Sequence, residues 1–444
     1  MSSSRSDFLR KTTAMGVGLS LTPHILKADI LGPARHGGAT YMGDFAAPKL
    51  STVKWAFIGV GARGSGHVRR MAAIEGTEIV AICDLYEDLV TKSVKASKEI
   101  GKGERHTNVA SYFGGENEWK KMLKKEKPDA VIISTPWKWH APMAITSMKQ
   151  GAHAFVEVPL AVTLEEMWDI VDTSEKTQKH CMMMENVNYG RDELLYLNMC
   201  RKGVIGELLH GEAAYIHELL WQMNEVDRGT GSWRTYHYAE RNGNLYPTHG
   251  LGPVAQYMNL ARGEDNFKRI CSFSSPGKGR NRYAEENFNA DHKWNKLDFK
   301  GGDINTSIVK TTLGRTIMVQ WDESSKRPYT RHNLIQGTKG ILAGFPTRIA
   351  LEGGVEGATK NHHGWAQGEK LAAVYEKYEH PLYKRLGEIS KKMGGHGGMD
   401  FMMFYRMVEC LQNGLPLDQN VYEGCFWSAV GPLSETSVAV SYTH

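Results

Sequence analysis

The pattern of apolar and polar positions changes near residue 189. Before that point, short continuous apolar runs alternate with amphipathic stretches of helical period. Continuous apolar runs are typical of strands buried on both faces of a parallel sheet, and their alternation with helices predicts a doubly wound, Rossmann-type α/β sheet. The predicted strands are Val53–Val60, Glu78–Cys83, Asp129–Thr135, His153–Val158 and His180–Asn186, and the helices include His67–Ile74, Pro142–Gln150 and Leu164–Thr177.

After Tyr189 the apolar runs are longer and are separated by polar, aromatic loops. This pattern predicts a second, α+β domain with an open, largely antiparallel sheet, closed by helices Asp400–Gln412 and Tyr422–Val440. The charged segment Gly277–Lys300 is expected to be an exposed excursion. The predicted strands are Leu208–Ile216, Phe267–Phe273, Thr306–Leu313, Thr316–Trp321 and Asn333–Ala343. The predicted organisation is a leader and linker over 1–48, a Rossmann domain over 49–187 and the second domain over 188–444.

Composition excludes several classes of protein. The 444 residues carry 54 Lys+Arg against 49 Asp+Glu, and a net charge of +5 is too small and dispersed for nucleic-acid binding. Six cysteines without a CxxC pair predict neither a metal cluster nor a disulfide framework. Since no stretch approaches about 20 apolar residues, no membrane span is expected. A homo-oligomer is compatible with this composition.

The N-terminus has the pattern of an export signal. A basic, hydroxyl-rich start, Ser4–Lys11, precedes a short, mildly apolar stretch, Ala14–Leu21. The start resembles a twin-arginine signal, with Ser6 in place of the second arginine. We therefore expect export to the periplasm or the medium, and a disordered tail is the alternative.

A glycine-rich turn follows the first predicted strand and opens a helix. In a G-x-G-x-x-G turn the first glycine permits the tight bend, the second lets a pyrophosphate approach the backbone, and the third lets the helix pack on the strand. Asp84 ends the next strand, 20 residues beyond the last glycine. Its carboxylate can accept hydrogen bonds from ribose hydroxyls and would repel a 2′-phosphate, so the bound cofactor is predicted to be NAD. The residues of the turn are Gly59, Gly61, Ala62, Arg63 and Gly64.

Unusual residues end the next three predicted strands. Ligands of doubly wound sheets bind beyond the carboxyl ends of the strands. We therefore expect cofactor contacts there, while packing alone is the alternative for the tryptophan-rich segment. The predicted contacts are Trp137, Lys138, Trp139, His140, Glu157, Val158 and Asn186.

Taken in order along the chain, seven motifs resemble those of a known family. They are Trp137-Lys138-Trp139-His140, Glu157-Val158, Glu185-Asn186-Val187, Trp233-Arg234-Thr235, Tyr246-Pro247-Thr248-His249-Gly250, Arg327-Pro328-Tyr329 and Gly394-Gly395-His396-Gly397-Gly398. Together with the two-domain pattern, they resemble the Gfo/Idh/MocA oxidoreductase-like superfamily and, more narrowly, glycoside hydrolase family 109, the NAD-dependent α-N-acetylgalactosaminidases. The resemblance covers residues 53–440.

Two departures from the wider superfamily matter for function. Its net dehydrogenases have a Glu-Lys-Pro strand end whose lysine helps to move the proton of the oxidised alcohol, and this chain has Val158 there. The D-x-x-x-H pair of the second domain is also replaced, here by the segment Tyr246–Gly250. These departures disfavour a simple sugar dehydrogenase.

The resemblance implies a specific mechanism. A hydride passes from C3 of the sugar to NAD, the C2 proton is removed, the aglycone leaves from C1, water adds, and the hydride returns. His396 lies in a loop of four glycines, and an imidazole there suits proton transfer at the leaving group. The resemblance implies that His396 is this acid/base and that His249 faces C3 and the nicotinamide. Tyr189 is a candidate further base. The implied substrate contacts are Tyr215, Arg234, Tyr246, Pro247, Thr248, His249 and Tyr329.

Three functional hypotheses remain at this level. The first is a glycosidase that removes terminal N-acetylgalactosamine (GalNAc) and regenerates NAD in each turnover. The second is a net NAD-dependent sugar oxidoreductase, and the third is a non-catalytic NAD-dependent sugar sensor. Turnover of NADH separates the first two, and a sensor would release no product.

Overall fold

The structure is a computed structural model that describes residues 39–355 and 363–441. The predicted export signal lies outside the described residues. Both predicted domains belong to one compact unit, Tyr41–His444. In the described ranges, no helix combines the length and apolar character that a membrane span requires.

The N-terminal half contains a six-stranded sheet in which every pair of neighbouring strands is parallel. The strand order β3-β2-β1-β4-β5-β6 is that of a Rossmann fold. All residues of β4 and β5 are buried, as their continuous apolar sequences require. The predicted fold class of this half is confirmed. The strands are β1 (Val53–Ile58), β2 (Thr77–Cys83), β3 (Ala110–Tyr112), β4 (Ala130–Ile133), β5 (His153–Val156) and β6 (Cys181–Met183).

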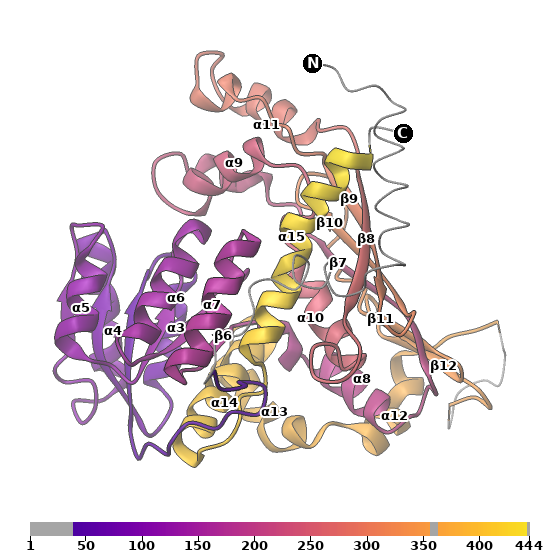
Figure 1. Ribbon diagram of the computed structural model, residues 1–444, viewed down its shortest axis with the longest axis horizontal. Helices are drawn as coiled ribbons and strands as arrows, with labels where there is room; N and C mark the ends of the chain where they lie inside the picture. Colours follow the sequence, from indigo (N-terminus) through magenta and orange to yellow (C-terminus); the bar gives the residue numbers. More distant parts are fainter. Residues whose placement is uncertain (1–38, 356–362, 442–444) are drawn as a thin grey trace. The chain divides into compact units, whose positions relative to one another are not determined.

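Helices connect these parallel strands (Figure 1). Helix α7 shows how local sequence sets a boundary, because the Thr163 hydroxyl accepts from the Glu166 amide while the Glu166 carboxylate accepts from the Thr163 amide. The helices are α3 (Gly64–Ala72), α4 (Glu87–Ile100), α5 (Glu118–Glu126), α6 (His140–Lys149) and α7 (Leu164–Thr177).

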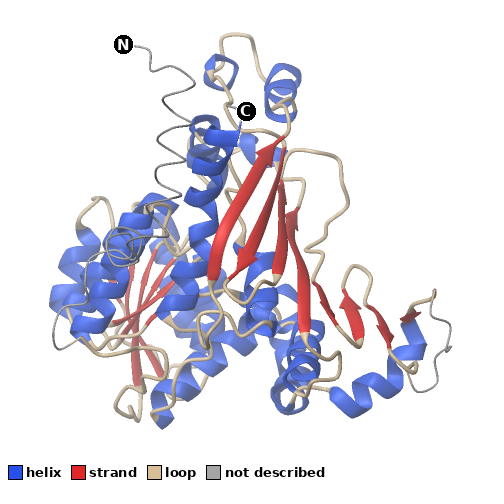
Figure 2. Ribbon diagram, turned by 45° about the vertical axis from the view of Figure 1, so that its right-hand side comes forward, coloured by secondary structure: helices blue, strands red, loops and turns tan. Residues whose placement is uncertain are grey.

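The second sheet has eight strands in the order β14-β13-β12-β11-β7-β10-β9-β8. Among the described strand pairs of this second sheet, only β7–β10 is parallel, so the predicted, largely antiparallel sheet is confirmed. Figure 2 shows its strands as a group separate from the Rossmann sheet. The strands are β7 (Leu208–Ile216), β8 (Phe267–Ser274), β9 (Ile304–Thr311), β10 (Thr316–Asp322), β11 (Leu334–Gly337), β12 (Gly340–Ala343), β13 (Arg348–Leu351) and β14 (Ala366–Gln367).

The prediction of one strand over Asn333–Ala343 was wrong. The segment folds back on itself as the hairpin β11–β12, with Gly337 paired to Gly340 across a turn at residues 338–339. The Gly-Thr-Lys-Gly sequence supplies the turn residues that end the first strand.

Two helices hold the second sheet to the rest of the unit. Helix α15 packs on α7 of the Rossmann half and on β8 of the second sheet, while α10 packs on β7. The helices after β6 are α8 (Arg191–Arg201), α9 (Thr230–Glu240), α10 (Thr248–Tyr257), α11 (Gly279–Asn287), α12 (Ala372–Tyr378), α13 (Pro381–Met393), α14 (Met399–Asn413) and α15 (Val421–Ser441).

The segment Gly277–Lys300, expected to be an exposed excursion, contains a helix and a buried anchor. It contains α11, and Trp294 is fully buried with its indole N–H donating to the Met223 carbonyl at 2.9 Å. Trp294, Phe299 and Met223 belong to a small separate core. Most of the segment is exposed or half-buried, as expected for an excursion, and these apolar residues anchor it to the rest of the domain.

Part of the predicted linker also packs on the folded unit. The Tyr41 ring stacks on Tyr422 at 5.2 Å, and the Met42 amide donates to the Tyr422 hydroxyl at 3.0 Å. Met42 and Ala47 are buried. Residues before the predicted boundary at 48 are therefore part of the packed unit.

Candidate active site

The glycine turn after β1 has the geometry that a dinucleotide requires. Gly59 has φ +85°, and a Cβ on it would lie 2.7 Å from the Ser134 carbonyl oxygen. A Cβ on Gly64 would lie 1.9 Å from the Gly59 oxygen, so only glycine lets α3 start this close to the strand. A Cβ on Gly61, by contrast, would have no described atom within 4 Å. That open space, at the N-terminus of α3, fits a pyrophosphate.

Asp84 holds this turn in place. One carboxylate oxygen accepts from the Val60 amide at 2.7 Å, and the other accepts from the Tyr86 amide at 3.1 Å. The half-buried carboxylate therefore lies beside the open turn, at the carboxyl end of β2. This position fits the predicted contact with the adenine-side ribose of NAD.

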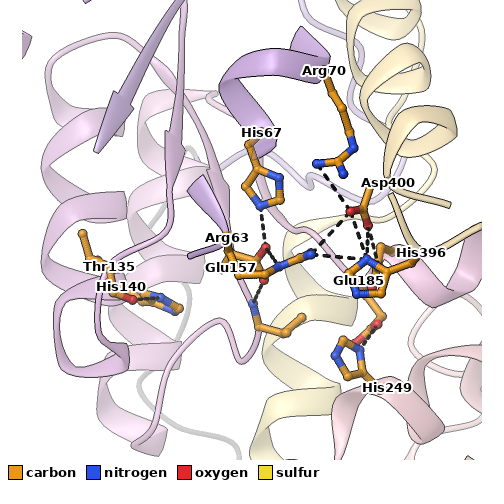
Figure 3. A network of polar contacts seen from close by, with 12 residues as sticks. Arg63, His67, Arg70, Thr135, His140, Glu157, Glu185, His249, His396 and Asp400 are labelled. Carbon is orange, nitrogen blue, oxygen red and sulfur yellow. Dashed lines mark hydrogen bonds and ion pairs between the residues drawn. The ribbon is translucent and has the colours of Figure 1, made fainter. Parts of the chain in front are cut away.

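Arg63, in the same turn, reaches across to the end of β5 (Figure 3). Its Nε donates to Glu157 Oε1 at 3.0 Å, and His67 Nε2 lies 2.6 Å from the same oxygen. Burial alone would raise the pKa of Glu157, but the Arg63 charge and the His67 hydrogen bond hold this pKa well below its usual range. Glu157 therefore stays ionised and fixes the direction of the Arg63 guanidinium.

His396 lies in a loop whose backbone only glycine-rich sequence can adopt. All five residues of Gly394–Gly398 have positive φ, and His396 itself has φ +48°. His396 Nδ1 lies 3.0 Å from Oδ2 of Asp400, in the first turn of α14, and Arg63 Nη1 lies 3.3 Å from the same nitrogen. The His396 side chain is 52% exposed, whereas Asp400 is fully buried. The predicted acid/base therefore combines an accessible ring with a fixed orientation.

Asp400 is held as an anion. Burial would raise its pKa, but the His396 hydrogen bond and the Arg63 charge lower it below the usual range. Asn186 Nδ2 donates to Asp400 Oδ1 at 2.6 Å. An ionised partner favours a proton on Nδ1 of His396, which leaves Nε2 as the nitrogen for proton exchange with a substrate.

His249 forms a second histidine–carboxylate pair. Its Nδ1 lies 2.6 Å from Oε1 of Glu185, which is fully buried. Among the described residues, several groups near this pair have buried polar atoms without a hydrogen-bond partner, including Glu185 Oε2, the Asn188 amide and the Thr248 hydroxyl. Buried polar groups without partners are rare in folded proteins, so these atoms indicate a place for a polar ligand.

The two pairs are anchored on consecutive residues. Glu185 contacts His249, and Asn186 contacts the Asp400 carboxylate that holds His396. Both residues lie in the segment just after β6, at the carboxyl end of the Rossmann sheet. The fold thus places two histidines suited to proton transfer at the same strand end.

The predicted substrate residues form an aromatic cluster beside His249. The Tyr215 ring lies 4.8 Å from Tyr246 and 5.0 Å from His249. Trp137, from the Rossmann half, lies 5.3 Å from Tyr246, and the Arg234 guanidinium lies 4.7 Å over the Trp137 ring. Arg234 Nε is buried and, within the described part of the chain, lacks a partner. The cluster therefore offers aromatic faces and a free N–H donor.

The remaining predicted substrate residues lie at its margins. Pro247 caps the N-terminus of α10, and Thr248 is the first residue of that helix. Tyr329 is 42% exposed, and its hydroxyl accepts from Arg331 at 2.7 Å. Its ring lies 6.3 Å from Tyr215, so the cluster extends toward solvent through Tyr329.

The tryptophan-rich segment contributes in different ways. Lys138 is exposed and lies 5.8 Å over the half-buried Trp139 ring. His140 is fully buried, with its ring nitrogens 2.7 Å from the Pro159 carbonyl and 2.9 Å from the Thr135 carbonyl. The His140 ring therefore ties two strand ends together, and only its backbone is left for a cofactor.

Tyr189 does not have the surroundings of a base. Its hydroxyl donates to Asp418 Oδ2 at 3.2 Å, and Arg406 holds that carboxylate at 2.7–2.9 Å. Burial and the Asp418 charge raise the pKa of Tyr189 well above its usual value. These surroundings disfavour the predicted role of Tyr189 as a further base, because its hydroxyl already donates to Asp418 and its pKa is raised.

Two functional partners were missed in the sequence. Asp400 follows His396 by four residues, across the start of a helix, and that spacing could have indicated the pair. Glu185 lies 64 residues from His249, and no local pattern connects them. Only the packing of α10 beside the end of β6 brings these two together.

Comparison with known proteins identifies both halves. Residues 53–185 match the model of the oxidoreductase family with an NAD-binding Rossmann fold, and residues 189–443 match that of the glycosyl hydrolase 109 C-terminal domain. The fold also resembles levoglucosan dehydrogenase in complex with NADH and levoglucosan, with a TM-score of 0.63, 15% identity and coverage of 88% of this chain and 98% of that one. At such identity the likeness shows the fold alone.

Sequence relatives cover nearly the whole chain. A glycosyl hydrolase family 109 protein 1 of Akkermansia muciniphila is 64% identical over 92% of this chain and 83% of its own length. A glycosyl hydrolase family 109 protein of Shewanella pealeana is 54% identical over 99% of this chain and 94% of its own length. With its NAD-binding Rossmann domain and its family-specific second domain, this chain belongs to glycosyl hydrolase family 109.

Proposed function

We propose that the protein hydrolyses terminal α-linked GalNAc from glycans and keeps NAD as a catalyst that is regenerated in each turnover. The observation that carries the proposal is the anchoring of two histidine–carboxylate pairs on Glu185 and Asn186. An ordinary glycosidase uses two carboxylates at the scissile bond, and NAD-dependent families are exceptions to that pattern. Here histidines occupy the positions for proton transfer.

The two histidines divide the proton transfers. NAD, when bound, accepts a hydride from C3 of the sugar and returns it at the end of the cycle. His249, oriented by Glu185 at 2.6 Å and packed on Tyr215 and Tyr246, handles protons on the C2–C3 side of the sugar. His396, oriented by Asp400, protonates the oxygen that leaves from C1 and later takes a proton from water.

The aromatic cluster supports an N-acetylated sugar. Arg234 lies over Trp137 and 5.5 Å from the Tyr246 ring, with its Nε buried and lacking a partner among the described residues. A guanidinium N–H fixed in this way is suited to the carbonyl of the N-acetyl group, and the tyrosine faces are suited to a sugar ring.

Val158 favours hydrolysis over net oxidation. It is 3% exposed and carries no titratable group at the position where the resembling dehydrogenases have a lysine. The acid/base groups of this site lie instead on the two histidines, one of which is placed toward the leaving group. A net oxidoreductase has no use for that second histidine.

A panel of chromogenic glycosides tests the proposal. The purified protein is assayed on aryl α- and β-GalNAc, α-galactose and N-acetylglucosamine (GlcNAc) glycosides, with and without added NAD, while absorbance of NADH is followed. We expect release of the aryl group from α-GalNAc without net formation of NADH. Stoichiometric NADH with no released sugar would contradict the proposal and indicate an oxidoreductase.

A further inference from the structure

A cavity of about 470 Å³ lies beside His396. Its walls come from the start of α8, the loop after β12, helix α13 and the loop that carries His396. This volume is in the range of small-molecule pockets. The residues used below are Glu193, Arg331, Phe345, Tyr383, Ser390 and His396.

Two residues of the cavity wall contact Tyr329, at the margin of the aromatic cluster. Phe345 packs edge-on against Tyr329 at 5.6 Å, and Arg331 donates to the Tyr329 hydroxyl at 2.7 Å. Arg331 also lies 5.0 Å from the Phe345 ring. On the other side, the cavity is bounded by the His396 loop. It therefore lies between a predicted substrate residue and the proposed acid.

That position determines what the cavity can hold. If His396 protonates the oxygen between GalNAc and its leaving group, the leaving group must extend from that oxygen along the His396 side. We propose that this cavity binds the aglycone, and that its occupant is the neutral sugar to which GalNAc is attached. The proposal rests on the proposed function and deepens it.

The charges around the cavity favour a neutral occupant. Arg331 Nη2 lies 2.5 Å from Glu193, and Arg191 Nη2 lies 2.5 Å from Glu379. The Asp192 carboxylate accepts from the Tyr375 hydroxyl at 2.5 Å. The two guanidinium charges are paired with carboxylates, and the hydrogen-bonded Asp192 carboxylate would repel an anion, so a phosphate or carboxylate would gain little here and would lose its hydration.

Polar atoms and aromatic rings favour a sugar among neutral groups. Arg331 is 7% exposed and Ser390 is 1% exposed, and their Nε and Oγ atoms have no hydrogen-bond partner in the ranges 39–355 and 363–441. Both residues line the cavity, together with the rings of Phe345 and Tyr383. Sugar hydroxyls can satisfy the polar atoms while the C–H face of the ring packs on an aromatic side chain.

The test compares substrates that differ only in the aglycone. Wild-type holoenzyme and a Tyr383→Ala variant are assayed on three α-GalNAc substrates: the disaccharide with galactose, the glycoside of a serine-containing peptide, and the 4-nitrophenyl glycoside. We expect kcat/KM of the variant for the disaccharide to fall about 10-fold, while kcat/KM for the nitrophenyl glycoside stays within about two-fold. Ser390→Ala should show the same pattern if Tyr383→Ala fails to fold. Tyr405→Ala is the control, because Tyr405 is a half-buried tyrosine on α14 outside the cavity lining.

The outcomes separate this inference from the proposed function. A wild-type protein that cleaves none of the three substrates refutes the proposed function. A wild-type protein that cleaves them, with both variants impaired equally on all three or on none, refutes the aglycone site alone. Selective loss on the peptide substrate would show that the cavity binds peptide and would overturn the sugar assignment.

Discussion

His396 and Asp400 are joined by a contact of 3.0 Å between Nδ1 and Oδ2, which links the glycine loop to the first turn of α14. Asp400 is tied in turn to Asn186, at the end of the Rossmann sheet, at 2.6 Å. The proposed acid of the second domain is thus oriented by a residue next to the cofactor site. One strand end therefore positions both the group that protonates the leaving group and the groups that act at C3.

We expect the His396→Ala variant to depend strongly on the leaving group. Substrates with a poor leaving group need protonation of the departing oxygen, so their kcat/KM should fall by about 10²–10⁴-fold, and activated aryl glycosides should lose much less. Asp400→Asn should show the same trend at smaller amplitude, while His249→Ala should slow every substrate. The dependence is measured as kcat/KM on a series of α-GalNAc glycosides whose leaving groups differ in acidity.

Glu409→Gln is the matched control, because Glu409 is an acidic residue of the same helix that pairs with Arg385 instead. Equal losses for His396→Ala across all leaving groups would contradict its role as the acid.

The glycine turn allows a sharp test of cofactor binding. At Gly61 a Cβ meets no described atom within 4 Å, so Gly61→Ala should fold normally and lose NAD affinity by about 10-fold or more, because the methyl group takes the space for the pyrophosphate. At Gly64 a Cβ would meet the Gly59 oxygen at 1.9 Å, so Gly64→Ala should lower both the Tm and NAD affinity. Calorimetric titration and thermal melting of NAD-free protein separate the two effects. If Gly61→Ala bound NAD as tightly as the wild type, the turn would not be part of the cofactor site.

Glu157 should contribute a pH-dependent part of the stability. Its folded-state pKa lies below its unfolded value, so its contribution is fully present above pH about 4.3 and is lost as the pH falls toward the folded pKa. Glu157→Gln removes the carboxylate that Arg63 and His67 share, which leaves Arg63 only the longer contact to Asp400 at 3.4 Å, and should cost on the order of 2 kcal/mol at pH 7. The stability gap between wild type and variant, measured by denaturant unfolding, should narrow between pH 5 and pH 3. A gap that widens on acidification would mean that the carboxylate is not held by its neighbours.

Arg228 should slow the loss of NAD. It comes from the second domain and donates to both Asp88 oxygens at 3.0 and 2.9 Å, with its guanidinium 4.1 Å over the Tyr86 ring. Tyr86 follows Asp84 by two residues, so this contact spans the ribose end of the cofactor site. We expect Arg228→Ala to release bound NAD several-fold faster in a stopped-flow displacement assay.

Arg282→Ala should leave NAD release unchanged, because Arg282 makes a comparable surface pair with Glu286 on α11, a helix that contributes no predicted cofactor contact. Identical release rates in wild type and Arg228→Ala would show that the contact plays no part in retention.

The parts of the site that the sequence revealed are those encoded by neighbours in the chain. Gly59, Gly61 and Gly64 fix a backbone turn by their own conformational freedom, and the glycines around His396 do the same for its loop. The partners that the sequence did not reveal are distant: Arg63 reaches Asp400 across 337 residues, and His249 reaches Glu185 across 64. Such contacts depend on how two sheets pack, which a local pattern does not encode.

Long-range contacts also determine the surroundings of Trp294 and Tyr189. The buried Trp294 lies in a segment that is polar on average, so hydropathy averaged over its neighbours does not reveal that it anchors the segment. Tyr189 directly follows the strand-end motif, but its hydroxyl turns to Asp418 in a later part of the chain. In both cases a single long-range contact outweighs the local pattern.

Hydrolysis in D2O distinguishes elimination through an oxidised C3 from direct displacement at C1. Elimination through an oxidised C3 requires the C2 hydrogen to leave the sugar, and the later addition of water returns a hydrogen from solvent. Direct displacement at C1 leaves the C2 hydrogen untouched. If elimination occurs, GalNAc released by the holoenzyme in D2O should carry deuterium at C2, as detected by NMR and mass spectrometry. Released GalNAc with its original C2 hydrogen would contradict this mechanism.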